Sequence, residues 1–157
     1  MSDPITQHEL EVLYAECAEA LDDRDFDRWP SFFVENGSYS VVTKENFDRG
    51  WPHALMLCES RGMMIDRAVA LKKSTFMIPR LQRRVLSGIR VTRMEGDLAH
   101  SRASFAVFET FTGESTTLYG CGRFLDVVGR HEGVLKFMKR TCILDSPVVP
   151  NSMPFPL

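Results

Sequence analysis

The sequence lacks the short motifs that usually bind a cofactor or activate a nucleophile. It contains no P-loop, no G-x-G-x-x-G and no G-x-S-x-G. Its histidines form no H-x-x-x-H or H-E-x-x-H pair, and its cysteines form no C-x-x-C. These residues are His8, His53, His100 and His131, and Cys17, Cys58, Cys121 and Cys142. We therefore expect no cofactor and no metal in this chain, and we expect buried, reduced thiols.

The sequence also lacks the features of a membrane, secreted or nucleic-acid-binding protein. No apolar run approaches the roughly 20 residues that cross a bilayer. The first residues carry neither basic charges nor an apolar segment. The formal net charge of −2 gives no electrostatic reason to bind a nucleic acid or an anionic membrane. We expect a cytoplasmic protein whose 157 residues fold as a single domain, 1–157.

The N-terminal helix is marked at its start and along one face. Thr6 and Glu9 have the spacing of a capping box, in which each side chain binds the backbone N–H of the other residue. Apolar residues then recur at helical spacing, at Leu10, Leu13, Cys17 and Leu21. The pattern predicts an amphipathic helix that packs on a core.

The next segments mix helical and loop signals. A short helix is expected from Asp27 to a stop at Asn36-Gly37, followed by a strand over residues 38–42. Residues 43–59 contain Gly and Pro and predict a loop that could include a short strand at 55–58. A further helix is expected over residues 60–73.

Four β-rich segments fill the second half of the chain. They are residues 83–94, 100–111, 116–128 and 134–145, with turn-like breaks at 95–97, Gly113 and 129–133. Helices followed by a run of strands predict an α+β domain, in which the helices pack on one face of the sheet. The prolines of residues 147–157 predict an extended tail.

Two strands carry expectations about their faces. Alternation in the last strand puts Leu135 and Phe137 on one side, and Lys136, Met138 and Arg140 on the other. The strand over residues 101–111 is apolar on both sides, so both of its faces need cover. The helices can cover one face. Either a partner subunit or a deep internal pocket would explain the other.

Without a cofactor motif, any chemistry would depend on ionisable side chains that face a cavity. The candidates are Tyr14, His53, Asp66 and Asp145. Simpler structural roles are available for three of them: a packed ring at Tyr14, a surface or interface ion pair of Asp66 with Arg67, and a turn at Asp145. The basic residues Arg80, Arg83 and Arg84 could face anions or protect an edge strand.

Several motifs occur in an informative order. They are Asp25-Phe26-Asp27-Arg28-Trp29-Pro30-Ser31-Phe32-Phe33, Gly37-Ser38-Tyr39, Met64-Ile65-Asp66-Arg67-Ala68-Val69-Ala70-Leu71, and Leu135-Lys136-Phe137-Met138-Lys139-Arg140 running into Asp145-Ser146. Together they resemble the small (beta) subunits of Rieske-type aromatic-ring-hydroxylating oxygenases across nearly the whole chain. The Trp-Pro-x-Phe-Phe element, Asn46-Phe47-x-x-Gly50 and the tail from Pro150 to Leu157 look most like members paired with aromatic-acid oxygenases, such as the small subunits of salicylate 5-hydroxylase and terephthalate dioxygenase.

The resemblance implies the cystatin-like fold shared with nuclear transport factor 2. This fold has a cone-shaped, strongly curved, mainly antiparallel sheet with N-terminal helices packed on it. The resemblance also implies an α3β3 heterohexamer. Its large (alpha) subunit would carry the [2Fe-2S] Rieske cluster, the mononuclear Fe(II) and the substrate, and NAD(P)H would act through separate electron-transfer components. The small subunits would form a trimer and have a structural role.

We hypothesise that six residues take part in subunit contacts. They are Arg83, Arg84, Asp66, Arg67, Asn151 and Phe155. Many family members have Arg-His where this chain has Arg83-Arg84, and a charged Arg84 would need an acidic partner across an interface. Extended tails gain order mainly by docking, so loss of residues 150–157 should impair assembly before folding.

Two other functions stay open at this point. A free-standing enzyme of the same fold would isomerise or dehydrate small ring compounds, and it needs an ionisable pair that converges in a cavity. A ligand-binding or dimerisation module of the same fold would have an accessible apolar pocket and no large-subunit partner. The sequence does not name the aromatic substrate, because selectivity would reside in the large subunit.

Overall fold

Helices followed by long strands make up the described part of the chain, which in the computed structural model is residues 3–73, 79–148 and 153–157. The helices are α1 (Gln7–Asp22), the 3-10 helix η1 (Trp29–Phe32), α2 (Lys44–Arg49) and α3 (Arg61–Lys73). The strands are β1 (Phe33–Thr43), β2 (Met56–Cys58), β3 (Arg80–Glu95), β4 (Leu98–Phe111), β5 (Thr117–His131) and β6 (Val134–Leu144). The predicted α+β class is confirmed.

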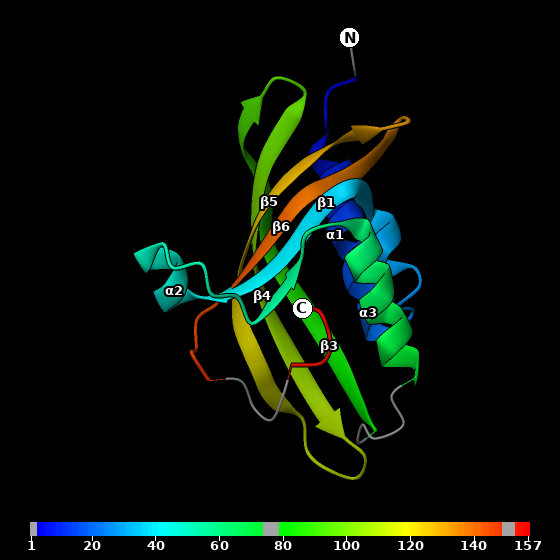
Figure 1. Ribbon diagram of the computed structural model, residues 1–157, viewed down its shortest axis with the longest axis vertical. Coiled ribbons are helices and arrows are strands. Elements are labelled where there is room, and N and C mark those ends of the chain that lie inside the picture. Colours follow the sequence, from blue (N-terminus) through cyan, green and yellow to red (C-terminus); the bar gives the residue numbers. More distant parts are fainter. Residues whose placement is uncertain (1–2, 74–78, 149–152) are drawn as a thin grey trace.

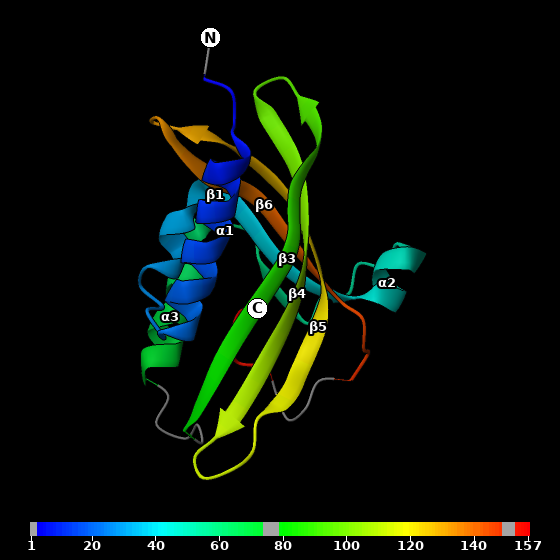
Figure 2. The same cartoon turned by 180° about the vertical axis from the view of Figure 1, so that it is seen from behind.

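The sheet is curved, and its two faces differ. The strand order is β2-β1-β6-β5-β4-β3, and among these neighbours only β1 and β6 are parallel. Helices α1 and α3 lie together against one face, here called the inner face, whereas α2 stands on the opposite side (Figure 1, Figure 2). The predicted mainly antiparallel, curved sheet with packed helices is confirmed. Among the described residues, α2 is the helix on the outer side, and most of that face carries none (Figure 1).

The core lies between α1, α3 and the inner face. The predicted capping box is present, because the Thr6 hydroxyl accepts the Glu9 N–H and the Glu9 carboxylate accepts the Thr6 N–H. The four apolar residues predicted along α1 are all buried. The Trp29 ring lies 5.2 Å from Tyr39 and 5.9 Å from Phe33, both edge to face. The aromatic motif around η1 therefore anchors the chain to the core.

The second predicted helix is wrong in extent. Only Trp29–Phe32 is helical, and β1 already runs through Asn36 and Gly37. This Asn-Gly pair, expected to stop a helix, lies inside a register shift of the β1–β6 pair. A Cβ at Gly37 would lie 2.9 Å from the carbonyl oxygen of Val34, so the close backbone approach requires glycine. The pair marks a bulge and not a helix end.

A second bulge reverses the predicted face of Arg140. The β5–β6 register passes from Val127 opposite Lys139 to Val128 opposite Phe137, so Met138 has no partner of its own. The extra residue puts Arg140 on the inner face together with Phe137, where both are buried. Strict alternation had predicted opposite sides.

Two further boundaries differ from the prediction. Residues 43–59 contain the expected β2 but also α2, which Thr43 caps and which Gly50 ends in the left-handed conformation at φ 66°. Strand β5 continues past the expected break at Gly129 and ends at His131. The turn that follows is Glu132-Gly133, and both of these residues have positive φ.

Strand β3 forms one edge of the sheet, and side chains protect part of that edge. The Gln7 side-chain amide donates to the Ile89 carbonyl oxygen at 2.6 Å. The Arg84 N–H donates to the Asp22 carboxylate at 3.2 Å. A further strand cannot pair at these positions.

Candidate functional site

A buried ion pair lies on the inner face between β5 and β6. Arg140 donates through Nε and Nη2 to the Asp126 carboxylate at 2.9 to 3.2 Å, and each residue is 3% exposed. The guanidinium also lies 3.9 Å from the Phe124 ring centroid, 4.1 Å from Phe137 and 4.7 Å from Tyr14. Arg140 is thus paired along its edge, stacked on aromatic rings and buried from solvent.

Burial changes the proton affinity of the groups in this cluster. Burial opposes the charge of Arg140, but the Asp126 carboxylate outweighs this effect and raises the pKa of the guanidinium. Burial, reinforced by Asp126, raises the pKa of Tyr14 well above its ordinary value, and the Tyr14 hydroxyl lies 3.0 Å from Ser101 Oγ. Burial also raises the pKa of Cys17 to about 11. At neutral pH the cluster therefore provides neither a phenolate nor a thiolate.

A second buried polar network joins α1 and β3 to the C-terminal residues. Arg84 Nη1 donates to Asp22 at 2.7 Å, while Nη2 donates to Gln82 Oε1 and to the Pro156 carbonyl oxygen. Gln82 in turn donates to the Glu109 carboxylate at 2.9 Å. The acidic partner that we expected for Arg84 across an interface is therefore found within the same chain.

Residues 153–157 pack against this network and belong to the fold. Phe155 stacks on Phe26 with centroids 5.6 Å apart, and the Arg80 guanidinium lies 5.3 Å from its ring centroid. Leu157 is buried, and its N–H donates to the Tyr39 hydroxyl at 2.7 Å. Phe155 and Leu157 are part of the main apolar core. Loss of these residues should therefore disturb folding as well as assembly, whereas the sequence predicted an effect on assembly first.

The four acid–base candidates do not converge. Tyr14 lies in the buried cluster described above, whereas His53, Asp66 and Asp145 are exposed on separate elements. In the part of the chain that the structure describes, these four residues form no ionisable pair with one another.

The other residues predicted for subunit contacts differ in position. Arg83 projects from the outer face with a side chain that is 76% exposed and lies 3.9 Å from the Asp22 carboxylate. Arg67 lies half-buried beside the Cys58 thiol, while its neighbour Asp66 points to solvent, so the two do not form the expected ion pair. Asn151 lies outside the described residues.

An apolar patch occupies the outer face of β3, β4 and β5. We define this outer patch as Leu81, Val85, Phe108 and Leu118, which are 70%, 51%, 36% and 53% exposed. Phe108 lies opposite both Leu118 and Arg83 in the strand register, so the patch is continuous across the strands. The double-faced strand β4 thus has a buried inner face and an uncovered outer face. Large apolar side chains side by side in solvent are typical of an interaction surface.

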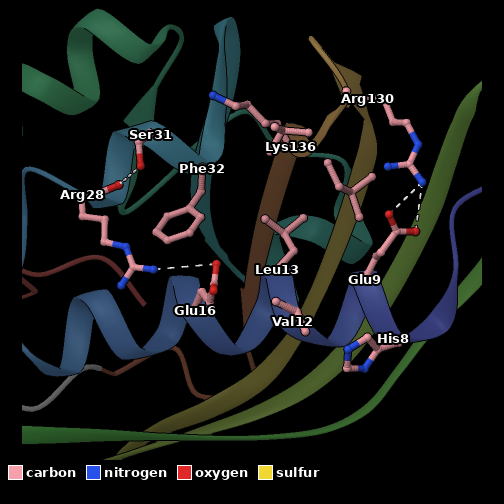
Figure 3. Close-up of a pocket in the computed structure, with 13 residues that line it drawn as sticks. His8, Glu9, Val12, Leu13, Glu16, Arg28, Ser31, Phe32, Arg130 and Lys136 are labelled. Atoms are coloured by element: carbon pink, nitrogen blue, oxygen red, sulfur yellow. Dashed lines mark hydrogen bonds and ion pairs between the residues drawn. The ribbon is translucent and has the colours of Figure 1, made fainter.

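A groove of about 700 Å³ lies on the other side of the molecule, between α1, η1 and the β5–β6 hairpin (Figure 3). We call it the α1–β6 groove. Its floor consists of the buried side chains of Leu13, Phe32 and Leu135. Two ion pairs flank this floor, Arg130 with Glu9 at 2.9 Å and Arg28 with Glu16 at 3.7 Å.

Glu9 has a double role at this groove. The Thr6 backbone N–H, the Thr6 hydroxyl and Arg130 all donate to its carboxylate, and these hydrogen bonds lower its pKa to about 2. One carboxylate therefore caps α1 and ties the helix to β5.

No group of three or more His, Cys, Asp or Glu side chains could hold a metal ion in residues 3–73, 79–148 and 153–157. In those same ranges, no helix has both the length and the apolar composition needed to cross a membrane.

Sequence reasoning missed the buried charges of Asp126, Arg140 and Glu109. For Asp126 a signal existed, because it alternates with Phe124 and Val128 along β5 and so shares their buried face. No comparable signal marks Arg140, since the bulge before it changes the alternation.

Comparisons with known proteins agree over nearly the full chain. A family model described as "Ring hydroxylating beta subunit" matches residues 16–151. The chain is 26% identical over 152 residues to the small subunit of anthranilate 1,2-dioxygenase from Burkholderia cepacia, covering 97% of this chain and 94% of that protein. It is 24% identical over 153 residues to a beta subunit of the terephthalate 1,2-dioxygenase terminal oxygenase component from Comamonas sp., covering 98% and 99%. Among solved structures, the beta subunit assigned to an aromatic-ring-hydroxylating dioxygenase of Novosphingobium aromaticivorans has a TM-score of 0.88 and 32% identity, covering 96% of each chain.

Proposed function

Since the chain belongs to the family of ring-hydroxylating beta subunits and is the small subunit of an aromatic ring-hydroxylating dioxygenase, we propose that its role is structural. In this role it holds the subunits of the complex together and carries no catalytic residue. In this proposal the large (alpha) subunit holds the Rieske [2Fe-2S] cluster, the mononuclear Fe(II) and the substrate, and NAD(P)H acts through separate components. Anthranilate and terephthalate, which the names of the relatives contain, are both aromatic carboxylates. We therefore propose an aromatic acid as the substrate. As a separate proposal, we place the protein in the cytoplasm.

The main support for this proposal is that the ionisable groups on the inner face are buried and paired with one another. A free-standing enzyme of this fold needs an accessible ionisable pair in a cavity. Here the central pair, Asp126 with Arg140, is closed off by aromatic rings, and Tyr14 packs against it. The other acid–base candidates are exposed and separate. These observations support an assembly role over an isomerase or a dehydratase.

The outer patch supports self-association. We propose that it meets a second copy of the chain within a trimer, as part of an α3β3 complex. Arg83 projects beside Phe108 in this patch and would contact the neighbouring copy. Arg84 and Phe155 are both buried, so they would support the interface indirectly by holding the β3 region in place. Asp66, Arg67 and Asn151 remain proposed contact residues on other parts of the chain.

Replacing both residues of the buried ion pair tests whether this chain contributes to catalysis. The double variant Asp126→Leu with Arg140→Met should assemble with the large subunit and support turnover close to the unmodified rate, since volume and packing are nearly kept. Turnover of an aromatic acid is measured per assembled iron–sulfur cluster, so poor assembly does not count as lost chemistry. A drop of roughly a hundredfold or more in a fully assembled complex, the size of an acid–base contribution, would show that this chain takes part in the reaction.

A charge on the outer patch tests the trimer. Leu118→Glu should lower the molar mass in light scattering from that of three chains toward that of one, because a carboxylate buried in an apolar contact is costly. Val148→Glu is the matched control, since Val148 is 74% exposed and lies outside the patch. If both variants keep the mass of the unmodified chain, the outer patch is not the trimer contact.

A further inference from the structure

We infer that the α1–β6 groove receives a segment of the large oxygenase subunit in which a carboxylate lies next to an apolar side chain. This inference rests on the proposed function and names the surface that holds the large subunit.

The apolar part of the groove is incompletely covered in this chain. The buried floor of Leu13, Phe32 and Leu135 continues into Val12 and Val134, which are 38% and 57% exposed. Covering these side chains removes apolar area from water and so favours binding. A volume of about 700 Å³ has room for several side chains of a partner segment.

The charges of the groove leave one cation without an acidic partner. Arg130 and Arg28 are each paired with a glutamate, at opposite ends of the groove (Figure 3). Lys136 projects from β6 between these ends and forms no ion pair with any residue of the described ranges. A carboxylate from a partner is the group that would complete this charge pattern.

Ion pairs within the chain also fix the walls of the groove in the absence of a partner. The Glu9–Arg130 pair connects α1 to β5, and the Glu16–Arg28 pair connects α1 to the segment before η1. Pre-organised walls reduce the conformational entropy lost on binding. The groove lies on the helical side of the sheet and the outer patch on the opposite face. One chain can therefore hold a second copy and a large subunit at the same time.

Two variants and one matched control test the assignment. Purified large subunit is titrated against the unmodified chain, Lys136→Glu, Val134→Asp and Lys139→Glu, with biolayer interferometry as the readout. Lys139 is exposed on the same strand as Lys136 but does not line the groove. Lys136→Glu and Val134→Asp should each weaken binding by at least about tenfold, whereas Lys139→Glu should change it less than about twofold. Thermal melting of each variant confirms that it is folded, and Val134→Asp changes a side chain that is already more than half exposed.

The outcomes separate the inference from the proposed function. If the unmodified chain does not bind the large subunit, the proposed function fails. If it binds and both folded groove variants bind equally well, the groove assignment is overturned while the proposed function stands. If the groove variants lose self-association and keep the large subunit, the groove belongs to a second copy and the inference is again overturned.

Discussion

The replacement of Phe155 by Ala is a direct test of the finding that the C-terminal residues are core. The Phe155 ring is 4% exposed, stacks on Phe26 and is covered by Arg80. Truncation of a buried Phe typically costs about 3–5 kcal/mol. In a domain of this size each kcal/mol lowers Tm by roughly 2–4 °C. The expected fall in Tm is therefore about 6–20 °C.

Circular dichroism melting and urea unfolding measure this change. Val148→Ala is the matched control, because it removes an apolar side chain from the same C-terminal region at a position that is 74% exposed. The control should stay within about 0.5 kcal/mol of the unmodified chain.

The same variant separates folding from assembly. At temperatures where Phe155→Ala is still folded, it should bind the large subunit in the unmodified ratio, because the ring faces its own core. A variant that melts with the Val148→Ala control but loses the large subunit would refute this reasoning, and Phe155 would then be an interface residue.

Three further changes test other parts of the fold. Asp126→Asn leaves Arg140 buried without a carboxylate, so the free energy of unfolding in urea should fall by about 3–5 kcal/mol, and a loss below 1 kcal/mol would contradict the buried pair. The hydrogen bonds of Glu9 lower its pKa to about 2 in the folded protein. The stability that they contribute is therefore complete above the ordinary pKa of 4.5 and is lost as the pH falls through about 2. A carboxyl NMR titration with a midpoint near 4.5 would contradict this. Iodoacetamide should label the half-buried Cys121 before Cys17, because Cys17 is buried and burial raises its pKa to about 11. Peptide mass mapping that finds the reverse order would contradict the burial of Cys17.

Local patterns predicted much of the fold. The capping box at Thr6 and Glu9, the apolar face of α1 and the positions of the four long strands follow from short-range chemistry, and all are present. Helix α2 was missed although both of its signals, Thr43 at the start and Gly50 at the end, are in the sequence. Gly and Pro in that segment favoured a loop, and the helix is only six residues long.

The candidate site was harder to predict because it depends on long-range partners. The bulge at Met138 changes the face of every residue after it, and nothing in local composition marks it. The partner of Arg84 is Asp22, which lies 62 residues away on α1. No periodicity relates those two positions. Surface grooves such as the α1–β6 groove form only when distant elements pack.

The parallel pairing of β1 with β6 has a consequence for biosynthesis. Tyr39 lies opposite Arg140, roughly 100 residues later in the chain. The ribosome synthesises β1 long before β6, so the apolar surface of β1 and of the early helices stays uncovered until β6 has been made. The α1–β6 groove contains residues of β6, and it therefore does not exist on a nascent chain. On our inference, the large subunit can recognise only a small subunit in which β6 has been synthesised and has packed beside α1.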